Sequence, residues 1–496
     1  MNSSPYDQLL NYVKQTNALA QVSGLLSWDQ EVMMPPKGAQ ARSEQAAIVE
    51  AIAHERRSNI FIEQQLAEID TKTLDETQQA NIRLIRRSYE RSVRVPARLA
   101  EELARQTAIA QGVWAKARAA NRFDDFAPTL QRIIELKREE AACLQRNGLT
   151  KYDALLNDFE PGMTVSRLQP LLESLRPRLS TLRQKISEST VKQKGLNGTF
   201  DRDTQMVLAR KLADVVGYDW EAGRLDLSVH PFSSGTAGDS RITTRIDEQD
   251  PLGCLYSTIH ELGHALYEQG LANCDALTPV AHHVSMGVHE SQSRLWENQI
   301  ARSLPFCEWF YPSFKAAFPN SGIGSANDLY RAVNQVQTGF IRTESDEVHY
   351  NLHVLLRFEL ERELIAGELD VKDLEAEWNR RFKRDFGLEV PGAAQGVLQD
   401  VHWSVGLFGY FPTYSLGNIY AGQINETLRR DLPDMDAGIS MGENTDILKW
   451  LRQKIHHNGS LYEPHELMER TVGQPISTEP LLTYLETKYA ELFDLQ

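Results

Sequence analysis

The chain has 496 residues, of which 41% are hydrophobic and 24% are charged, a composition typical of a soluble globular protein with a large core. The formal net charge of −15 argues against a nucleic-acid partner, because duplex binding draws much of its affinity from Lys and Arg side chains that neutralise phosphates. No run of 18 apolar residues and no basic segment followed by an apolar run occurs, so we expect no membrane span, no secretory signal and a cytoplasmic location.

The chain shows no internal division. No linker rich in Pro, Ser or Gly and no fixed-period repeat interrupts it, so we expect a single domain over residues 1–496. The cysteines are scattered without a Cys-x-x-Cys pair, which indicates reduced thiols rather than a disulfide framework or a thiolate metal site. They are Cys143, Cys254, Cys274 and Cys307.

Helical periodicity dominates the first part of the chain, to about residue 220. Apolar residues recur there at intervals of three and four, with charged residues between them. This pattern predicts helices near 6–24, 38–56, 73–94, 97–119, 126–146, 165–190 and 202–216. The sequence therefore predicts a mainly α fold with a helical N-terminal part.

The segment from about 223 to 246 breaks this pattern. The run Gly-Arg-Leu-Asp-Leu-Ser-Val-His-Pro-Phe is followed, after a Gly/Ser-rich turn, by Asp-Ser-Arg-Ile-Thr-Thr-Arg. Alternation and β-branched residues there predict a small antiparallel hairpin. An exposed edge of this hairpin would let an extended peptide bind through main-chain hydrogen bonds.

The next predicted helix covers residues 251–270. Asp250 suits the N-cap, Pro251 suits the first helical position and Gly270 suits the end. A helical wheel puts an apolar cluster on one side, formed by Leu255, Ile259, Leu262 and Leu266. One face of this helix can therefore pack against a core while the other remains free for a site.

The free face carries the sequence His260-Glu261-Leu262-Gly263-His264. Residues four apart lie one turn above each other, so His260 and His264 can share a tetrahedral metal ion while Glu261 stands beside a water molecule. Either histidine could instead bond to backbone or water in the core, but an acidic residue directly after the first histidine favours a metal site. This pattern is typical of the active site of a zinc hydrolase.

A catalytic zinc site needs a third protein ligand and one open position for water. The His-x-x-Gly-x-x-His extension of the metzincins is excluded, because positions 267 and 270 are Tyr and Gly. The remaining common arrangement takes a carboxylate from a second helix. We favour Glu290, near the start of the helical run 288–297, with Glu297 and Glu268 as alternatives.

Helical periodicity returns near 326–341 and 346–386, and shorter amphipathic helices are expected in the C-terminal part, 416–496. Residues 387–415 are rich in Gly, Pro and aromatic side chains, which is typical of irregular backbone that lines a site. Nine of the 13 histidines lie between 230 and 402. We therefore place the catalytic core at about 223–415.

Six separated motifs make the chain resemble the metallopeptidase family typified by carboxypeptidase Taq, over essentially its whole length. In chain order they are His230-Pro231-Phe232, Asp239 to Thr243, His260 to His264, His289 to Gln292, Ile341 to Asp346 and Gly396 to Trp403. The resemblance implies a helical fold with a deep groove, similar to neurolysin and angiotensin-converting enzyme. It also implies a homodimer, removal of single C-terminal residues from peptides, and Glu290 as third metal ligand.

One position departs from related zinc enzymes. Many enzymes with this ligand set carry an Asp four residues after the ligating Glu, whereas position 294 is Arg here. The carboxylate that orients a ligating histidine must then come from elsewhere. We expect it to be Asp346 or Asp400.

The expected chemistry is attack of water on an amide carbonyl, with broad specificity. Zinc, with cobalt as a substitute, would acidify the water, while Glu261 takes its proton and passes it to the leaving amine. Tyr414 follows His402 by twelve residues, a separation similar to that of the His and Tyr pair in neurolysin-like enzymes. We expect Tyr414 to face the oxyanion with His402 assisting, and Tyr410, one turn earlier, to line the substrate site.

A carboxypeptidase must also hold a free α-carboxylate, for which the planar guanidinium of Arg is best suited. Arg342 and Arg241 both lie in the motifs, and we prefer Arg342; His230 is expected at the substrate edge, and Asp239 is expected to bond to Arg241. An oligopeptidase that cuts internal bonds of short peptides is the nearest alternative. A non-catalytic peptide- or metal-binding scaffold is a further one, although a scaffold has no need of Glu261.

Overall fold

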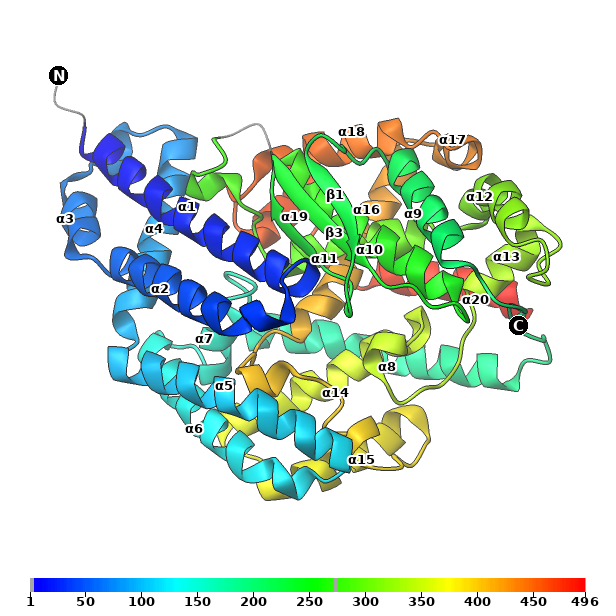
Figure 1. The fold of residues 1–496 in the computed structure, drawn as a ribbon, viewed down its shortest axis with the longest axis horizontal. Coiled ribbons are helices and arrows are strands. Elements are labelled where there is room, and N and C mark those ends of the chain that lie inside the picture. The colour runs from blue at the N-terminus through cyan, green and yellow to red at the C-terminus, as the bar shows by residue number, and fades with distance from the viewer. Residues whose placement is uncertain (1–3, 272–274, 496) are drawn as a thin grey trace.

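The computed structural model describes residues 4–271 and 275–495. Helices make up most of it, with one small sheet beside them, so the predicted mainly α fold is confirmed (Figure 1). The helices before the sheet are α1 (Pro5–Val32), α2 (Ala39–Arg57), α3 (Ile60–Glu68), α4 (Glu76–Arg94), α5 (Ala97–Ala120), α6 (Ala127–Leu144), α7 (Lys151–Leu156), α8 (Val165–Glu188) and α9 (Arg202–Val216). The seven predicted stretches correspond to α1, α2, α4, α5, α6, α8 and α9, while α3 and α7 were not predicted.

The sheet has three strands, β1 (Gly223–Leu227), β2 (Ser233–Thr236) and β3 (Asp239–Thr244), in the order β1-β3-β2. The two segments predicted to form an antiparallel hairpin are β1 and β3, and this pairing is wrong because they run parallel; the antiparallel pair is β2 and β3. The Gly/Ser-rich segment expected to be a turn is therefore a strand. The segment can pair closely with β3 because Gly235 has no Cβ. A Cβ at this position would lie only 1.8 Å from the Asp239 carbonyl oxygen.

The helices after the sheet carry the rest of the chain. They are α10 (Pro251–Gly270), α11 (Met286–Arg294), α12 (Leu304–Ala317), α13 (Ala326–Val333), α14 (Glu347–Ala366), α15 (Leu374–Phe386), α16 (Pro412–Asp431), α17 (Met435–Met441), α18 (Thr445–Lys454), α19 (Pro464–Val472) and α20 (Glu479–Phe493). The stretch predicted at 346–386 is two helices, because Gly367 ends α14 in the left-handed conformation, with φ of 85°. The helix predicted at 326–341 ends at Val333.

Buried apolar side chains form one main core, which extends from Ala110 in α5 to Phe493 in α20. Helices α1, α3 and α4 gather at one end of the molecule, near the N-terminus, around a smaller cluster of their own (Figure 1). Its buried members are Tyr6, Leu9, Ile62, Leu66, Ile82, Ile85 and Tyr89. In the main core α10 packs against α9, α11 and β3, and α11 packs against α16, so α10 and α11 lie at the centre of the protein.

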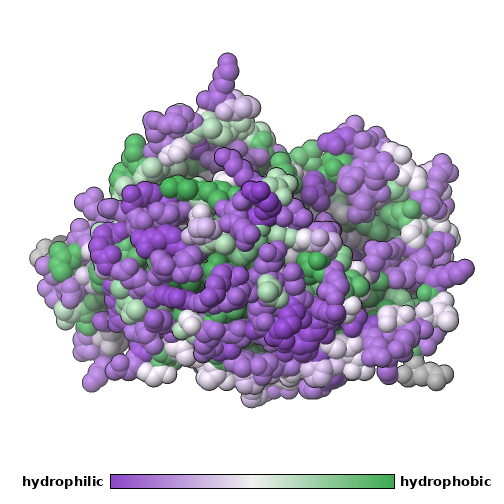
Figure 2. All heavy atoms as spheres, turned by 90° about the horizontal axis from the view of Figure 1, so that it is seen from below, coloured by the Kyte–Doolittle hydropathy of each residue, from purple (hydrophilic) through white to green (hydrophobic). Residues whose placement is uncertain are grey.

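The surface seen from below the view of Figure 1 is mostly hydrophilic, with hydrophobic side chains at scattered positions (Figure 2). None of the helices in the described ranges combines the length and the apolar character that a membrane span requires. Cys143, Cys254 and Cys307 are free thiols, as expected, whereas Cys274 lies outside the described residues. The deep groove implied by the resemblance stays a prediction.

Candidate metal centre

Helix α10 begins and ends where its sequence signals predict. The Asp250 carboxylate accepts a hydrogen bond of 3.1 Å from the Leu252 amide, and Pro251 occupies the first turn. The predicted apolar face is buried, since Leu255, Ile259, Leu262 and Leu266 are at most 1% exposed. The imidazoles of His260 and His264 point away from this face, and their side chains keep 20% and 14% of their surface.

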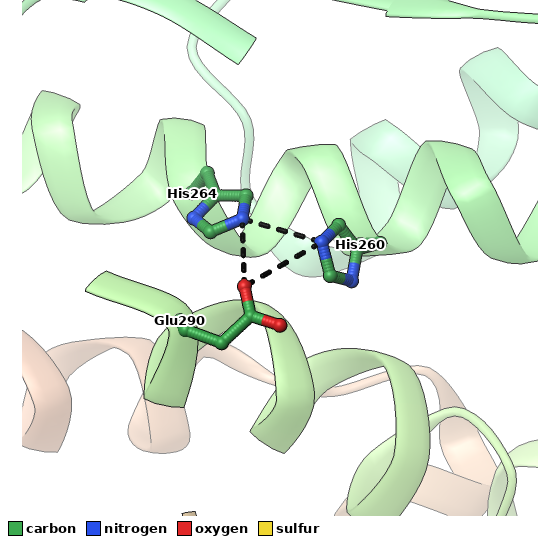
Figure 3. A group of neighbouring side chains, drawn as sticks. All are labelled: His260, His264 and Glu290. Carbon is green, nitrogen blue, oxygen red and sulfur yellow. Dashed lines mark hydrogen bonds and ion pairs between the residues drawn. The ribbon is translucent and has the colours of Figure 1, made fainter. Parts of the chain in front are cut away.

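Glu290 on α11 completes a triangle with the two imidazoles (Figure 3). The Nε2 atoms of His260 and His264 lie 3.3 Å apart, and Oε2 of Glu290 lies 3.8 Å and 3.4 Å from them, respectively. Ligand atoms on a tetrahedral ion with bonds of about 2.0–2.1 Å are separated by roughly 3.3–3.4 Å. This donor set therefore fits a divalent metal such as zinc, with one coordination position left over.

Two glycines let the helices approach closely enough for this geometry. A Cβ on Gly263 of α10 would lie 2.5 Å from the Cα of Ser293, so only glycine allows α11 to pack there. On the opposite side of α11, a Cβ on Gly417 of α16 would lie 2.5 Å from the Cγ of Glu290. The two glycines thus fix how closely α11 packs against α10 and α16, and with it the place from which Glu290 projects.

Glu297 orients His260. Its Oε2 lies 2.8 Å from Nδ1 of His260, which leaves Nε2 facing the other two ligand atoms. Glu297 belongs to a π-helical turn, Leu295–Ile300, that continues α11. Arg294 joins the two carboxylates: its Nε donates to Oε1 of Glu290 at 2.7 Å and its Nη1 donates to Oε2 of Glu297 at 3.3 Å.

The hypothesis that Asp346 or Asp400 orients a ligating histidine is wrong. Asp346 caps α14 by accepting from the amides of Val348 and His349, and it also bonds to the ring of His349. Asp400 forms ion pairs with Arg342 and Arg357. A usable signal was present, because Glu297 lies two helical turns after Glu290 and so projects from the same face.

Glu261 lies beside the triangle and is buried, with 7% of its surface exposed. Burial raises its pKa to about 7, an effect that the nearby charge of His260 opposes and that of Glu290 reinforces. For Glu297 burial acts in the same direction, but Arg294 and His260 outweigh it and lower the pKa to about 2. The two carboxylates therefore differ in proton affinity, as a base and an orienting group should.

His402, Tyr410 and Tyr414 form an aromatic group near Glu290, whose charge acts on both tyrosines. The Tyr414 hydroxyl lies 3.1 Å from Nε2 of His402, and the rings of Tyr410 and Tyr414 are 5.4 Å apart. Burial lowers the pKa of His402 to about 4 and raises the pKa of Tyr410 to about 12, to which the Glu290 charge also contributes. Both tyrosine hydroxyls thus stay protonated at neutral pH, since burial also raises the pKa of Tyr414 well above its ordinary value.

Hydrogen bonds to Glu361 of α14 hold the loop that carries His402 in place. The Glu361 carboxylate accepts hydrogen bonds from Trp403 Nε1 at 2.8 Å and from the Gly409 amide at 3.0 Å. Tyr152 on α7 donates a further bond of 2.8 Å to the same group. The irregular backbone expected over 387–415 is present, but its last residues begin α16.

Arg342 lies beside the ring of Tyr414 and is 4% exposed. Its guanidinium is 4.7 Å from the Tyr414 ring centre, pairs with Asp400 at 3.0 Å and donates to the Tyr350 hydroxyl at 3.0 Å. Arg241 and His230 lie in the sheet region, and the contacts that the structure describes for them are not with the metal triangle or with Tyr414. Arg241 pairs with Asp239, as expected, and covers the ring of Trp28 at 4.3 Å, while His230 is exposed on the loop between β1 and β2.

Comparison with known proteins decides the family. The sequence model of the family described as carboxypeptidase Taq (M32) metallopeptidase matches residues 8–489. Thermostable carboxypeptidase 1 of Thermus thermophilus is 40% identical, covering 98% of this chain and 99% of that protein. The crystal structure of an M32 carboxypeptidase from Deinococcus radiodurans R1 superposes with a TM-score of 0.96 at 34% identity, over 99% of this chain and 100% of that one.

The chain belongs to the carboxypeptidase Taq family. Carboxypeptidase 1 of Bacillus subtilis is a further relative, 32% identical over 98% of each chain. Membership in the carboxypeptidase Taq family makes the protein a hydrolase and a metallocarboxypeptidase, which acts on peptides and requires a divalent metal. The predicted enzyme class and family are thereby confirmed.

This carboxypeptidase Taq protein has a second cluster of potential metal ligands, which the sequence did not single out as a group. Glu268 of α10 lies beside His283 and His289, and the ligand atoms of the three side chains fall within 4.8 Å of one another. Glu268 was an alternative third ligand for the His260 and His264 pair. The structure joins it instead to His289 at 2.9 Å and to His283 at 3.1 Å.

Proposed function

We propose that the protein is a zinc carboxypeptidase of broad specificity that removes single residues from peptides with a free C-terminus, with His260, His264 and Glu290 as metal ligands. The observation that carries the proposal is the triangle of ligand atoms, 3.3 to 3.8 Å on each side, with a buried carboxylate next to it. A bound zinc ion, or cobalt in its place, supplies Lewis-acid chemistry that acidifies water and polarises a carbonyl group. The choice of zinc follows the pattern of His260, Glu261 and His264, and broad specificity follows the family resemblance.

Glu261 is the general base. It takes a proton from the attacking water and later passes this proton to the leaving amine, as the two halves of amide hydrolysis require. Its pKa of about 7 favours this exchange near neutral pH, because a group can both accept and release a proton most readily near its own pKa. Arg294 forms ion pairs with Glu290 and with Glu297. These two carboxylates therefore stay ionised, and Glu261 is the carboxylate of the site that exchanges protons.

Tyr414 stabilises the oxyanion. Its raised pKa keeps the hydroxyl protonated, so the hydroxyl can donate a hydrogen bond to negative charge that develops on the carbonyl oxygen. His402 holds this hydroxyl at 3.1 Å and Tyr410 packs edge-on against the same ring. We assign Tyr414 and His402 to catalysis, and Tyr410 to the wall of the substrate site.

Arg342 binds the α-carboxylate of the substrate. Its contacts with Asp400 and Tyr350 use three of the five N–H groups of a guanidinium, so two remain for a carboxylate. Arg241 and His230, in the sheet region, contact more distant parts of the peptide. The proposal also includes a single-domain homodimer in the cytoplasm with no nucleic-acid or membrane partner, which rests on composition and on the family resemblance.

Digestion of one defined peptide in two forms tests this function. Mass spectrometry should show a ladder of single-residue losses from the free-acid peptide and little cleavage of the same peptide with a C-terminal amide. Internal fragments from both forms would instead favour the oligopeptidase alternative. Chelation of the metal should stop the ladder, and re-addition of zinc should restore it.

A further inference from the structure

His264 is bonded through its second nitrogen to another histidine rather than to a carboxylate. Its Nδ1 lies 2.5 Å from Nδ1 of His289, and Nε2 of His289 lies 2.9 Å from Oε1 of Glu268. Nδ1 of His283 lies 3.1 Å from the same oxygen atom. A continuous series of contacts thus leads from the metal triangle to His283, whose side chain is 38% exposed.

We propose that His289 and Glu268 are positioning residues that fix the tautomer and the ring orientation of His264, so that its Nε2 lone pair faces the metal. This inference rests on the proposed role of His264 as a ligand. Neither residue touches the substrate or the metal. Each acts through the ring of His264, as Glu297 acts through the ring of His260.

The placement of protons follows from the contacts. An ionised carboxylate only accepts hydrogen bonds, so Nε2 of His289 must carry the proton that it shares with Glu268. A neutral imidazole has one N–H group and one lone pair, so Nδ1 of His289 is an acceptor. Nδ1 of His264 must therefore be the donor across the 2.5 Å contact, which leaves the lone pair on Nε2.

Packing holds the His289 ring in place for this task. Its side chain is only 11% exposed, and that of Glu268 is 12% exposed. The His289 ring centre lies 4.6 Å from that of His264, 4.7 Å from that of His283 and 5.3 Å from that of Tyr267. An imidazole enclosed in this way cannot easily rotate. Because the His289 ring is fixed, its contact with Nδ1 of His264 also fixes the orientation of the His264 ring.

The same three side chains could instead bind a second metal ion, because their ligand atoms lie within 4.8 Å of one another. An ion there would need the lone pair on Nε2 of His289, and the proton of that ring would move to Nδ1. His289 would then donate to Nδ1 of His264 and place the remaining proton of His264 on Nε2, where it would block the catalytic ligand. Neutral rings cannot serve both ions, so we assign the cluster to orientation.

Zinc affinity measured by competition with a chromophoric chelator tests the proposal. His289→Phe keeps a planar ring but removes both nitrogens, and we expect it to weaken zinc binding by about 10–100-fold. His289→Asn restores a polar atom near the position of Nδ1 and should recover part of the affinity. His282→Phe, at the neighbouring half-buried histidine outside this series of contacts, is the matched control and should bind zinc like the wild type.

Two further readouts separate orientation from folding. The visible absorption bands of the cobalt-loaded protein should shift in His289→Phe and not in His282→Phe, since they report the ligand geometry. The melting temperature of the metal-free protein should be similar in all variants. If His289→Phe lowers it, Glu268→Gln, which keeps the shape and removes the charge, gives the second measurement and should weaken zinc binding in the same direction.

The outcomes distinguish this inference from the proposed function. Wild-type zinc affinity in both His289→Phe and Glu268→Gln would overturn the positioning role. Two tightly bound zinc ions per wild-type chain, with one lost in His283→Ala, would overturn it as well, because the cluster would then be a metal site. Wild-type affinity in His264→Ala would instead show that the proposed ligand set itself is wrong.

Discussion

Gly417 is the position where one added methyl group tests the metal geometry most sharply. A Cβ there would lie 2.5 Å from Cγ, 2.6 Å from Cβ and 3.1 Å from the carbonyl carbon of Glu290. Carbon atoms in ordinary contact are about 3.5–4.0 Å apart, so Gly417→Ala must displace Glu290 by roughly 1 Å. These atoms are close to the backbone of α11, so a change of rotamer cannot relieve the overlap.

The displacement is larger than a metal site tolerates, since ligand distances must stay within about 0.2 Å of their normal values. We therefore expect Gly417→Ala to lose Glu290 as a ligand. Changes behind a ligand already cost 10–100-fold in affinity, so loss of the ligand should cost at least about 100-fold, or about 2.8 kcal/mol. Overpacking should also lower the free energy of unfolding of the metal-free protein by about 1–3 kcal/mol.

Chelator competition measures the zinc affinity, and denaturant titration of the metal-free protein measures its stability. Gly112→Ala in α5 is the matched control, because a Cβ there meets no atom within 4 Å. The control should gain roughly 0.5–1 kcal/mol of stability, as an alanine does in a helix, and bind zinc like the wild type. Wild-type zinc affinity in Gly417→Ala would refute the placement of the Glu290 carboxylate at the metal.

Three further changes probe the chemistry and the stability. Glu261→Gln should keep its zinc and lose at least about 100-fold in kcat, because the base is gone; wild-type turnover would remove Glu261 from that role. Arg342→Ala should lose most of its kcat/KM on free-acid peptides, and an equal loss on amidated peptides would count against carboxylate recognition. Glu361→Gln tests a pKa that burial raises to about 7. The folded protein holds this proton more tightly than the unfolded chain, so wild-type stability should fall as pH rises from about 4.5 through 7, by up to roughly 3 kcal/mol. Denaturation of the wild type and Glu361→Gln at pH 5 and pH 8 should show that the variant escapes this loss, whereas a constant difference between them would contradict it.

Local signals were sufficient where one element decides the outcome. The start of α10 follows from Asp250 and Pro251, which act on the backbone next to them, whereas Gly270, its last residue, has no positive φ and is instead a point of close packing, where a Cβ would meet Nδ1 of His456 at 2.3 Å. The two histidines share a face because of helix geometry alone. Gly367, which separates α14 from α15, was also visible in the sequence and could have been read as a helix end.

Packing between distant elements decided the rest. Glu297 reaches His260 because α11 packs closely against α10 at Gly263. The sequence of α11 alone does not reveal this contact between the two helices. Asp346 and Asp400 do not orient a ligating histidine because both have other partners. Asp346 caps the N-terminus of α14, and Asp400 forms ion pairs with two arginines. Strand β2, with the sequence Ser-Ser-Gly-Thr, has little intrinsic strand preference and forms because β3 offers it an edge.

Binding of one metal ion by His260, His264 and Glu290 underlies every role assigned to the site. A crystal of the zinc-loaded protein, with diffraction data collected on both sides of the zinc absorption edge, tests it directly. We expect one anomalous peak per chain, about 2.0–2.2 Å from Nε2 of each of the two histidines and from Oε2 of the glutamate. A peak among Glu268, His283 and His289 instead, with none at the triangle, would contradict it.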